Sequence, residues 1–311
     1  MGKIDKTGLL YALSSYLFWG TVPFYFWAVK EVSSLEVLSH RVLWSVVCLA
    51  AILRFQKRLI PTLKLLFNKK VFLSMLVTGS LMVTNWLIFI HAISSGQTLE
   101  SSFGYFILPL ISIALGFLVL GEKLSRSQFV ALFLASLGVI YQIVLIGELP
   151  WIALGLAITF GIYGLIRKQV KVGPIQGVFL EATIVLPVAA LALYVQGNKG
   201  LLVFGEDLHL TFLLSLAGFM TFIPLWLFSE GAKRIPLSAN GFLQFMTPTI
   251  HFFVAIVSFN EPLDSNRLVS FALVWVGLAI MVIFPLMRNQ IQSYKSRRSK
   301  KLHGHRGASA L

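Results

Sequence analysis

The sequence has few charged residues and a single cysteine. Only 12% of its 311 residues are charged, whereas a soluble domain carries about 25%. Hydrophobic residues make up 57% of the chain, and the mean hydropathy is +0.83. A soluble globule cannot hide so much apolar surface, because about a quarter of its chain surface stays wet at this size. One cysteine, Cys48, excludes disulfide frameworks, zinc sites and redox pairs. A soluble enzyme, a secreted scaffold and a disordered chain are therefore excluded.

Long apolar stretches take the place of the missing charges. A helix that crosses a membrane needs about 20 mostly apolar residues, and ten stretches of the chain meet this requirement. They are Thr7–Val29, Leu35–Leu53, Val71–Leu99, Ser101–Gly121, Ser127–Gly147, Leu149–Ile166, Pro174–Gln196, Leu210–Ser229, Ile235–Asn260 and Leu268–Met287. The alternating strands of a membrane barrel do not occur. The first stretch is too long for a cleaved signal peptide and is expected to stay as an anchor. The sequence therefore predicts an all-α integral membrane protein with ten transmembrane helices.

The basic residues indicate how these helices are oriented. The net charge is +14, and ten crossings place 22 of the 26 Lys and Arg residues on one side. Lys30, Lys199 and Arg267 fall on the other side, and Arg41 lies within a span. Cytoplasmic loops carry the excess of basic residues, so both termini are predicted to be cytoplasmic in a cell inner (plasma) membrane. The basic tail, residues 288–311, is expected to be disordered and to contact lipid headgroups rather than nucleic acid.

The two halves of the chain resemble each other. At an offset of 139 residues, Pro109 matches Pro248, Glu122 matches Glu261 and Gly138 matches Gly277. Residues 1–147 and 148–287 are therefore predicted to be two copies of one five-helix unit. Since five is odd, the second copy is inverted in the membrane, as in many secondary carriers. A duplication with no role in transport remains the alternative.

Several segments of the sequence have a familiar pattern: residues 39–45 (SHRVLWS), 85–89 (NWLIF), 99–109 (LESSFGYFILP), 121–123 (GEK) and 241–248 (GFLQFMTP). Together they resemble the RarD-type permeases, which belong to the EamA branch of the drug/metabolite transporter superfamily. The resemblance covers residues from about Lys6 to Phe284, and Asn260 departs from the Gly-Glu turn of the second copy. The resemblance implies an inner-membrane carrier with ten helices and two EamA repeats, whose physiological substrate is undefined.

Polar and aromatic side chains within the spans are candidates for a substrate site. Small-molecule pockets are mostly aromatic with a few placed polar groups, and ordinary helix packing is the alternative for each residue. The candidates are Trp19, Arg41, Asn85, Trp86, Tyr105, Tyr163, Asn240 and Gln244. Arg41 carries a planar fork that suits an anionic group. An internal ion pair with Glu100 is the alternative for Arg41.

Three titratable residues are candidates for proton coupling: His40, Glu100 and Glu181. A histidine titrates near neutrality, and a carboxyl group in lipid-like surroundings favours its neutral form. Structural roles remain the alternative for each of the three. Pro109 and Pro248 interrupt matching helices and are predicted hinges, with static bends as the alternative.

These features favour a secondary active transporter of small organic metabolites or drugs that works by alternating access, with proton coupling as an option. A membrane-embedded enzyme and a channel or sensor are the alternatives. The sequence contains no P-loop, H-E-x-x-H or G-x-S-x-G motif. We therefore expect no catalysis, no cofactor and no metal. The expected partners are membrane lipids and a small organic solute, and the sequence predicts no oligomeric state.

Overall fold

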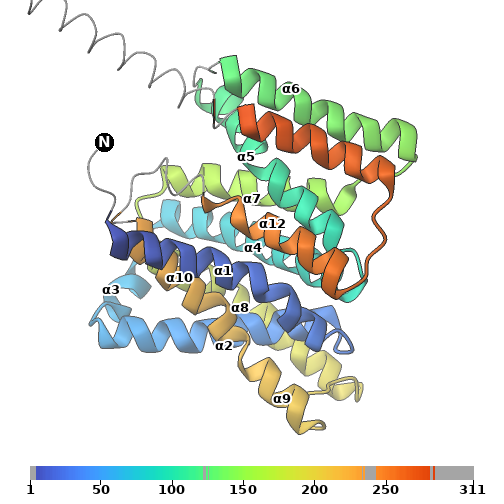
Figure 1. Cartoon of the computed structure of the whole chain (residues 1–311). Coiled ribbons are helices and arrows are strands. Elements are labelled where there is room, and N and C mark those ends of the chain that lie inside the picture. The colour runs from blue at the N-terminus through green and yellow to red at the C-terminus, as the bar shows by residue number, and fades with distance from the viewer. Residues whose placement is uncertain are drawn as a thin grey trace, which may run out of the picture. The chain divides into compact units, whose positions relative to one another are not determined.

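The computed structural model describes residues 5–121, 124, 126–232, 234, 243–280 and 283 (Figure 1). These residues form helices joined by short connections, and no strand occurs among them. The long helices are α1 (Lys6–Ala28), α2 (Ser34–Phe55), α4 (Lys69–Ser94), α5 (Thr98–Leu120), α6 (Arg126–Tyr141), α7 (Trp151–Gln169), α8 (Pro174–Asn198) and α10 (Ala217–Ala232). The other helices are α3 (Leu59–Lys64), α9 (Leu208–Ser215), α12 (Met246–Phe253) and a helix at Ser265–Ile280. The prediction of an all-helical chain is confirmed.

Six helices in the described part of the chain are long and apolar enough to cross a membrane. They are Ser34–Phe55, Lys69–Ser94, Thr98–Val119, Arg126–Val144, Pro174–Asn198 and Leu208–Phe228. The helices Trp151–Arg167, Met246–Ser258 and Ser265–Ile280 are apolar but shorter. A multi-pass membrane protein follows from these helices, and the count of ten spans stays a prediction.

Three of the predicted spans depart from a continuous α-helix. The stretch Leu210–Ser229 is divided between α9 and α10 at Leu216. In the stretch Ile235–Asn260, α12 ends in the π-helical turn Val254–Ser258. A further π-helical turn, Gln142–Ile146, follows α6. Such turns have wider spacing of their backbone hydrogen bonds and change the direction of the side chains that follow.

Polar side chains mark where several helices begin. Asp5 accepts a hydrogen bond from the Thr7 N–H at 2.9 Å, and Ser33 accepts one from the Glu36 N–H at 3.2 Å. Asp207 accepts one from the Leu210 N–H at 2.8 Å. Each side chain satisfies a backbone donor that the first helical turn leaves without a partner. These short polar residues therefore fix where the apolar helices begin.

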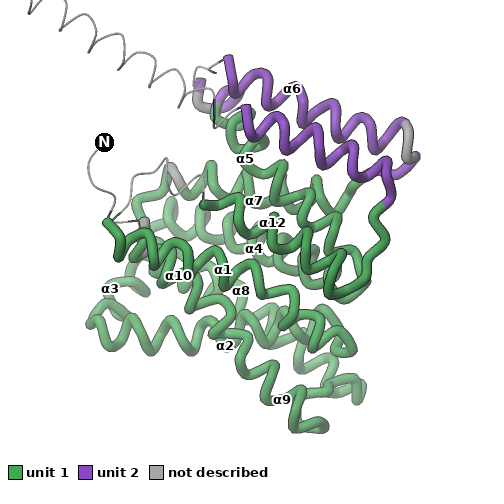
Figure 2. The backbone as a smooth tube through the Cα atoms, in the orientation of Figure 1, with its two compact units in different colours: residues 1–116, 150–263 green, residues 117–149, 264–311 purple. Residues whose placement is uncertain are grey.

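The chain divides into two compact units (Figure 2). Unit 1 contains Met1–Gly116 and Pro150–Leu263, and unit 2 contains Phe117–Leu149 and Asp264–Leu311. This division follows compactness in space, whereas the predicted domains of residues 1–147 and 148–287 follow the sequence repeat. The repeat boundaries therefore stay a prediction.

The helices of unit 1 run in two opposite directions. The helices α1, α4, α8 and α12 run one way, and α2, α5, α7 and α10 run the other way (Figure 1). The connections 29–33, 95–97, 199–207 and 259–263 consequently lie at the same end of unit 1, which we call the carboxylate end because of the glutamates described below. A hydrogen bond of 2.9 Å from Ser33 Oγ to Gln196 Oε1 joins the first of these connections to the last turn of α8.

Glycines let pairs of helices in unit 1 approach closely. A Cβ atom at Gly79 of α4 would lie 3.2 Å from the Glu181 carbonyl oxygen of α8. A Cβ atom at Gly218 of α10 would lie 2.6 Å from the Trp44 carbonyl oxygen of α2. Gly79 and Gly218 are 139 residues apart, which is the offset of the sequence repeat. Small residues at such contacts replace the hydrophobic driving force that lipid cannot supply.

Unit 2 contains the same kind of contact between α6 and the helix Ser265–Ile280. A Cβ atom at Gly138 would lie 3.0 Å from the Ser270 carbonyl oxygen. A Cβ atom at Gly277 of the second helix would lie 3.0 Å from the Ala131 carbonyl oxygen of α6. Arg267 and Glu148 close one end of this helix pair with an ion pair of 2.9 Å. The two glycines that match in the repeat therefore pack against each other's helices.

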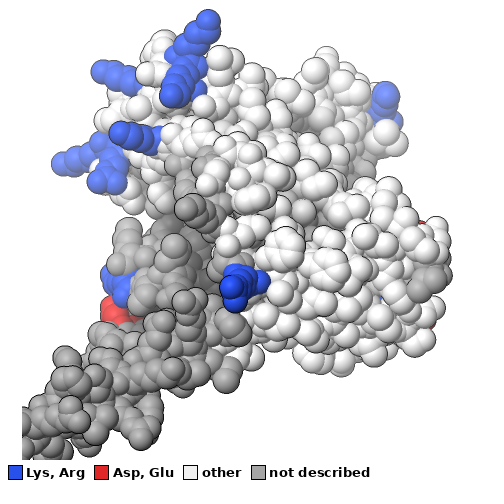
Figure 3. Space-filling model, turned by 90° about the horizontal axis from the view of Figure 1, so that it is seen from above, with Lys and Arg blue, Asp and Glu red and all other residues white. Residues whose placement is uncertain are grey.

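Many large apolar side chains lie on the surface, including Leu10, Leu118, Val188 and Phe212. Figure 3 shows one face, on which the charged side chains of the described residues are few and mostly basic, while the rest is a broad uncharged surface. An apolar surface of this extent is unfavourable in water and favourable against lipid chains.

We predict that Gly104→Ala destabilises the protein, whereas Gly164→Ala does not. A Cβ atom at Gly104 would lie 2.7 Å from the Ala153 carbonyl oxygen, and one at Gly164 meets no atom within 4 Å. Overpacking should lower the free energy of unfolding by about 1–3 kcal/mol for Gly104→Ala. Alanine in an open helical position should raise it by up to about 1 kcal/mol. Melting temperatures of the two purified variants test this, and equal values would contradict the packing described here.

Candidate functional site

Arg41 is buried among the helices of unit 1. The Ser33 cap starts α2, and Arg41 follows two turns later with a side chain that is only 8% exposed. Its Nε donates a hydrogen bond of 3.0 Å to Thr221 Oγ1 of α10. Thr221 is itself buried. The contact between α2 and α10, which Gly218 makes possible, therefore fixes the position of the guanidinium group.

Two aromatic rings lie close to the guanidinium group of Arg41, and further rings pack against one of them. The Cζ of Arg41 lies 4.0 Å from the ring centre of Trp86 and 5.5 Å from that of Phe26. Phe89 packs edge-to-face on Phe26, with ring centres 5.7 Å apart. Tyr105 and His251 lie 5.7 and 5.5 Å from Phe89. We call these six residues, Phe26, Arg41, Trp86, Phe89, Tyr105 and His251, the Arg41 cluster. Helices α1, α2, α4, α5 and α12 contribute to it.

The ion pair between Arg41 and Glu100 does not form. Glu100 Oε1 instead accepts a hydrogen bond of 2.9 Å from the Ile152 N–H at the start of α7. No carboxylate among the described residues pairs with Arg41. The expectation of this pair is wrong because Glu100, in the first turn of α5, caps the neighbouring helix instead.

The buried glutamates at the carboxylate end bind backbone amides. Glu36, which is fully buried, accepts hydrogen bonds of 2.9–3.3 Å from the N–H groups of Val203 and Phe204. Glu261 accepts bonds of 2.7 and 2.8 Å from the N–H groups of Thr98 and Leu99 at the start of α5. Helix N-termini favour negative charge, because their amides carry partial positive charge. These carboxylates therefore hold connections in place, and neither of them pairs with Arg41.

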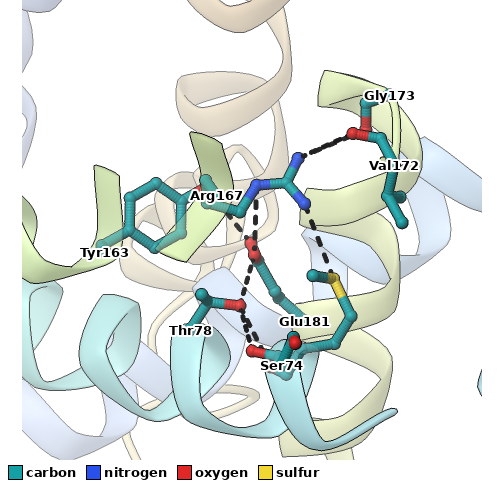
Figure 4. Close-up of polar contacts among 8 residues, drawn as sticks. Ser74, Thr78, Tyr163, Arg167, Val172, Gly173 and Glu181 are labelled. Carbon is teal, nitrogen blue, oxygen red and sulfur yellow. Dashed lines mark hydrogen bonds and ion pairs between the residues drawn. The ribbon is translucent and has the colours of Figure 1, made fainter. Parts of the chain in front are cut away.

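Glu181 is a further buried charge, and it is paired with an arginine (Figure 4). Its side chain is 3% exposed, and its Oε1 lies 3.7 Å from Arg167 Nε. Thr78 Oγ1 donates a hydrogen bond of 2.8 Å to the same oxygen, and the Tyr163 hydroxyl donates one of 3.4 Å to Oε2. Glu181 thus joins α4, α7 and α8 through three side chains.

Sequence reasoning missed Arg167, which it assigned to a cytoplasmic loop. The arginine follows the apolar stretch of α7, but its side chain is only 13% exposed. Its Nη2 donates to the Val172 and Gly173 carbonyl oxygens at 3.5 and 3.3 Å, and the guanidinium lies against Gly177 of α8. The spacing of four residues between Tyr163 and Arg167 was an available signal, because it places both side chains on one face of a helix.

The three candidates for proton coupling lie in separate surroundings. His40 stacks on Phe204, with ring centres 4.3 Å apart, and both of its ring nitrogens are buried without a hydrogen-bond partner among the described residues. Glu100 caps α7, and Glu181 lies in the network with Arg167. The structure therefore does not bring these candidates together.

Only some of the substrate-site candidates lie together. Arg41, Trp86 and Tyr105 belong to the Arg41 cluster, and Trp19 borders it because its carbonyl oxygen lies 3.0 Å from His251 Nε2. Asn85 is buried, and its Nδ2 donates to the Leu156 carbonyl and to Thr159 Oγ1 at 3.0 and 2.9 Å.

The remaining candidates lie apart from the Arg41 cluster. Tyr163 belongs to the Glu181 network, Gln244 is exposed and Asn240 lies outside the described residues. Pro109 lies inside α5, and Pro248 lies in α12, where its carbonyl oxygen accepts a hydrogen bond of 2.8 Å from Ser102. The described part of the chain holds no group of three or more His, Cys, Asp or Glu residues suited to a metal ion.

Apolar helices packed around a few buried charges define this chain as a multi-pass helical membrane protein. It belongs to the EamA-like transporter family, whose model matches residues 6–144 and again residues 149–283. It is 40% identical to the protein RarD of Escherichia coli, over 90% of this chain and 95% of that one. It is 39% identical to an uncharacterized transporter of Vibrio cholerae, over 89% and 92% of the two chains. The resemblance to RarD-type permeases is thereby confirmed.

A solved structure titled "Crystal structure of protein" shares the fold. It has a TM-score of 0.58 and 15% sequence identity, and the likeness covers 89% of this chain and 97% of that one. At this identity, the likeness concerns the course of the backbone and not the residues of the site.

We predict that Glu36→Ala lowers the melting temperature, whereas Glu206→Ala leaves it unchanged. Removal of the Glu36 carboxylate leaves the N–H groups of Val203 and Phe204 without their acceptor. An unsatisfied buried donor costs about 1–3 kcal/mol. Glu206 is exposed in the same connection and is the matched control. Thermal unfolding of both variants tests the prediction, and an unshifted Glu36→Ala protein would show that its hydrogen bonds contribute nothing.

Proposed function

We propose that this protein is a secondary active transporter, a permease that carries small organic solutes across the inner membrane by alternating access. Membership of the EamA-like transporter family supports the transport of solutes. The Arg41 cluster supports an organic cargo, since it places a buried cation among aromatic rings inside a membrane protein. Ionisable groups inside a membrane are expensive, and they commonly mark substrate pathways.

Two inverted five-helix repeats, residues 1–147 and 148–287, provide the two packings that alternating access requires. The two separate matches to the family model support this division. Contacts between helices support it as well. Gly79 and Gly218, which correspond in the repeat, both lie against the backbone of a neighbouring helix, and Gly138 and Gly277 do the same in unit 2. The excess of basic residues on one side supports cytoplasmic termini.

In this proposal the solute binds at the Arg41 cluster. Arg41, Trp86 and Tyr105 contact the solute, and Trp19 borders the site through its hydrogen bond with His251. Asn85, Tyr163, Asn240 and Gln244 belong to the pathway rather than to this cluster. Pro109 and Pro248 interrupt corresponding helices and act as hinges, since proline removes one backbone hydrogen bond.

Glu181 is the proton-coupling residue of the proposal, and His40 and Glu100 are secondary candidates. Its ionised carboxylate holds Arg167 and Tyr163 of α7 against α8, together with Thr78 of α4. Protonation removes the charge that attracts Arg167 and weakens this junction of three helices. Proton binding thereby favours a different packing of α7 and α8, which is the kind of bias that a two-state carrier needs.

Counterflow tests the proposed function. The protein is reconstituted into liposomes that contain an unlabelled solute, chosen because it raises the melting temperature of the purified protein. We expect the labelled solute to accumulate transiently inside these liposomes. A channel would give only equilibration and an enzyme would give a new product, so either result would contradict the proposal. Liposomes without protein are the control.

We predict that Glu181→Gln reduces the dependence of uptake on a pH gradient across the vesicle membrane. Glutamine keeps the shape of the side chain but neither binds nor releases a proton over the pH range of the imposed gradients. Glu230→Gln is the matched control, since Glu230 also pairs with an arginine, Arg234, at 2.7 Å, but at a partly exposed position. Uptake at several imposed gradients is measured for both variants. An unchanged pH dependence in Glu181→Gln would remove this residue from the coupling step.

A further inference from the structure

We propose that the Arg41 cluster is a recognition site for the carboxylate of a small organic monoanion with a planar apolar body. This inference rests on the proposed function, because it names the chemical class of the transported solute. It follows from the charge, the free donor edge and the apolar walls of the cluster.

Arg41 differs from the other buried charges of unit 1, because no opposite charge among the described residues pairs with it. The other buried charges, Glu36, Glu181 and Glu261, are each satisfied by backbone amides or by Arg167. Arg41 is 8% exposed, and no carboxylate among the described residues pairs with it. A buried charge without a partner is strongly destabilising. A bound anion supplies the missing charge.

The donor pattern of Arg41 suits a carboxylate. Thr221 engages Nε at 3.0 Å, and Trp86 lies over the guanidinium with its ring centre 4.0 Å from Cζ. The two Nη groups make no hydrogen bond within the described residues. Two parallel N–H groups on one edge of a guanidinium match the two oxygens of a carboxylate. A single cation balances a monoanion, whereas a phosphate dianion would need further donors.

The rest of the Arg41 cluster suits a flat apolar molecule with at most one polar substituent. Phe26, Phe89 and Tyr105 contribute aromatic surface, and flat rings pack well against such surfaces. His251 Nε2 faces the Trp19 carbonyl oxygen and therefore carries the proton, which leaves Nδ1 as an acceptor. Nδ1 is buried without a partner among the described residues. A hydroxyl or amine substituent on the ligand would satisfy it.

The first experiment compares benzoate, benzamide and benzylamine as probes of the purified full-length protein. The three share a planar ring and are respectively anionic, neutral and cationic at neutral pH. We expect benzoate to raise the melting temperature with saturation, benzamide to bind about ten- to a hundredfold more weakly, and benzylamine to have no effect. Equal responses to benzoate and benzamide would overturn the inference, as would no response to benzoate.

The second experiment separates a binding role of Arg41 from a structural one. Arg41→Met removes a charge that has no partner, so the ligand-free variant should melt at the same temperature as the parent or higher, and its response to benzoate should be lost. Arg167→Met is the matched control. It leaves Glu181 without its ion pair, so its melting temperature should fall while the response to benzoate remains. A stable Arg41→Met protein that still responds to benzoate would overturn the inference.

A milder variant keeps the inference testable if Arg41→Met does not fold. Arg41→Lys retains the charge but offers no two-point donor edge, so we expect benzoate to bind about tenfold more weakly. Native affinity in Arg41→Lys would overturn the proposed two-point recognition.

Counterflow distinguishes this inference from the proposed function. Binding of benzoate that depends on Arg41, with no counterflow of any solute, would contradict the proposed transport and leave the recognition site standing. Counterflow of other solutes without binding of benzoate would support transport and contradict the monoanion class.

Discussion

The arrangement of unit 1 depends on how charge is compensated inside a medium of low dielectric constant. A carboxylate buried there remains stable only where hydrogen bonds or an opposite charge replace the lost water. Glu36 and Glu261 obtain this from backbone amides, and Glu181 obtains it from Arg167, Thr78 and Tyr163. The consequence is structural, since each carboxylate fastens one helix or connection to another.

Close packing through glycine makes these polar contacts possible. Gly79 lies against the Glu181 carbonyl of α8, and Thr78, its neighbour in the chain, donates to the Glu181 carboxylate. Gly218 allows α10 to approach α2, and Thr221, one turn further along α10, accepts the hydrogen bond from Arg41. A short polar side chain reaches a buried charge only where the two backbones are this close. Packing and electrostatics are therefore parts of one arrangement.

Composition and the length of the apolar stretches predict the helices, because the membrane demands long apolar segments whatever their tertiary partners. The partners of buried charges do not follow from composition or from the apolar stretches. Glu100 and Arg41 both lie near the start of their helices, which suggested a pair, but Glu100 caps α7 instead. Arg167 follows an apolar stretch and resembles a loop residue in sequence, yet its guanidinium turns back onto α8. Rotation of each helix about its axis decides such contacts, and one sequence does not encode that rotation in any local pattern.

The proposed site and the proposed coupling residue carry opposite charges in two separate parts of unit 1. Arg41 is a cation that gains a partner when an anion binds, and Glu181 is an anion that loses its charge when a proton binds. An anion and a proton bound together leave the total charge of the protein and its load unchanged. The transition between the two packings then moves no additional charge through the apolar layer, where each unit charge at the centre costs about 2.5–3.5 kcal/mol. A carrier built on these two residues would favour binding the anion and the proton in the same half of its cycle.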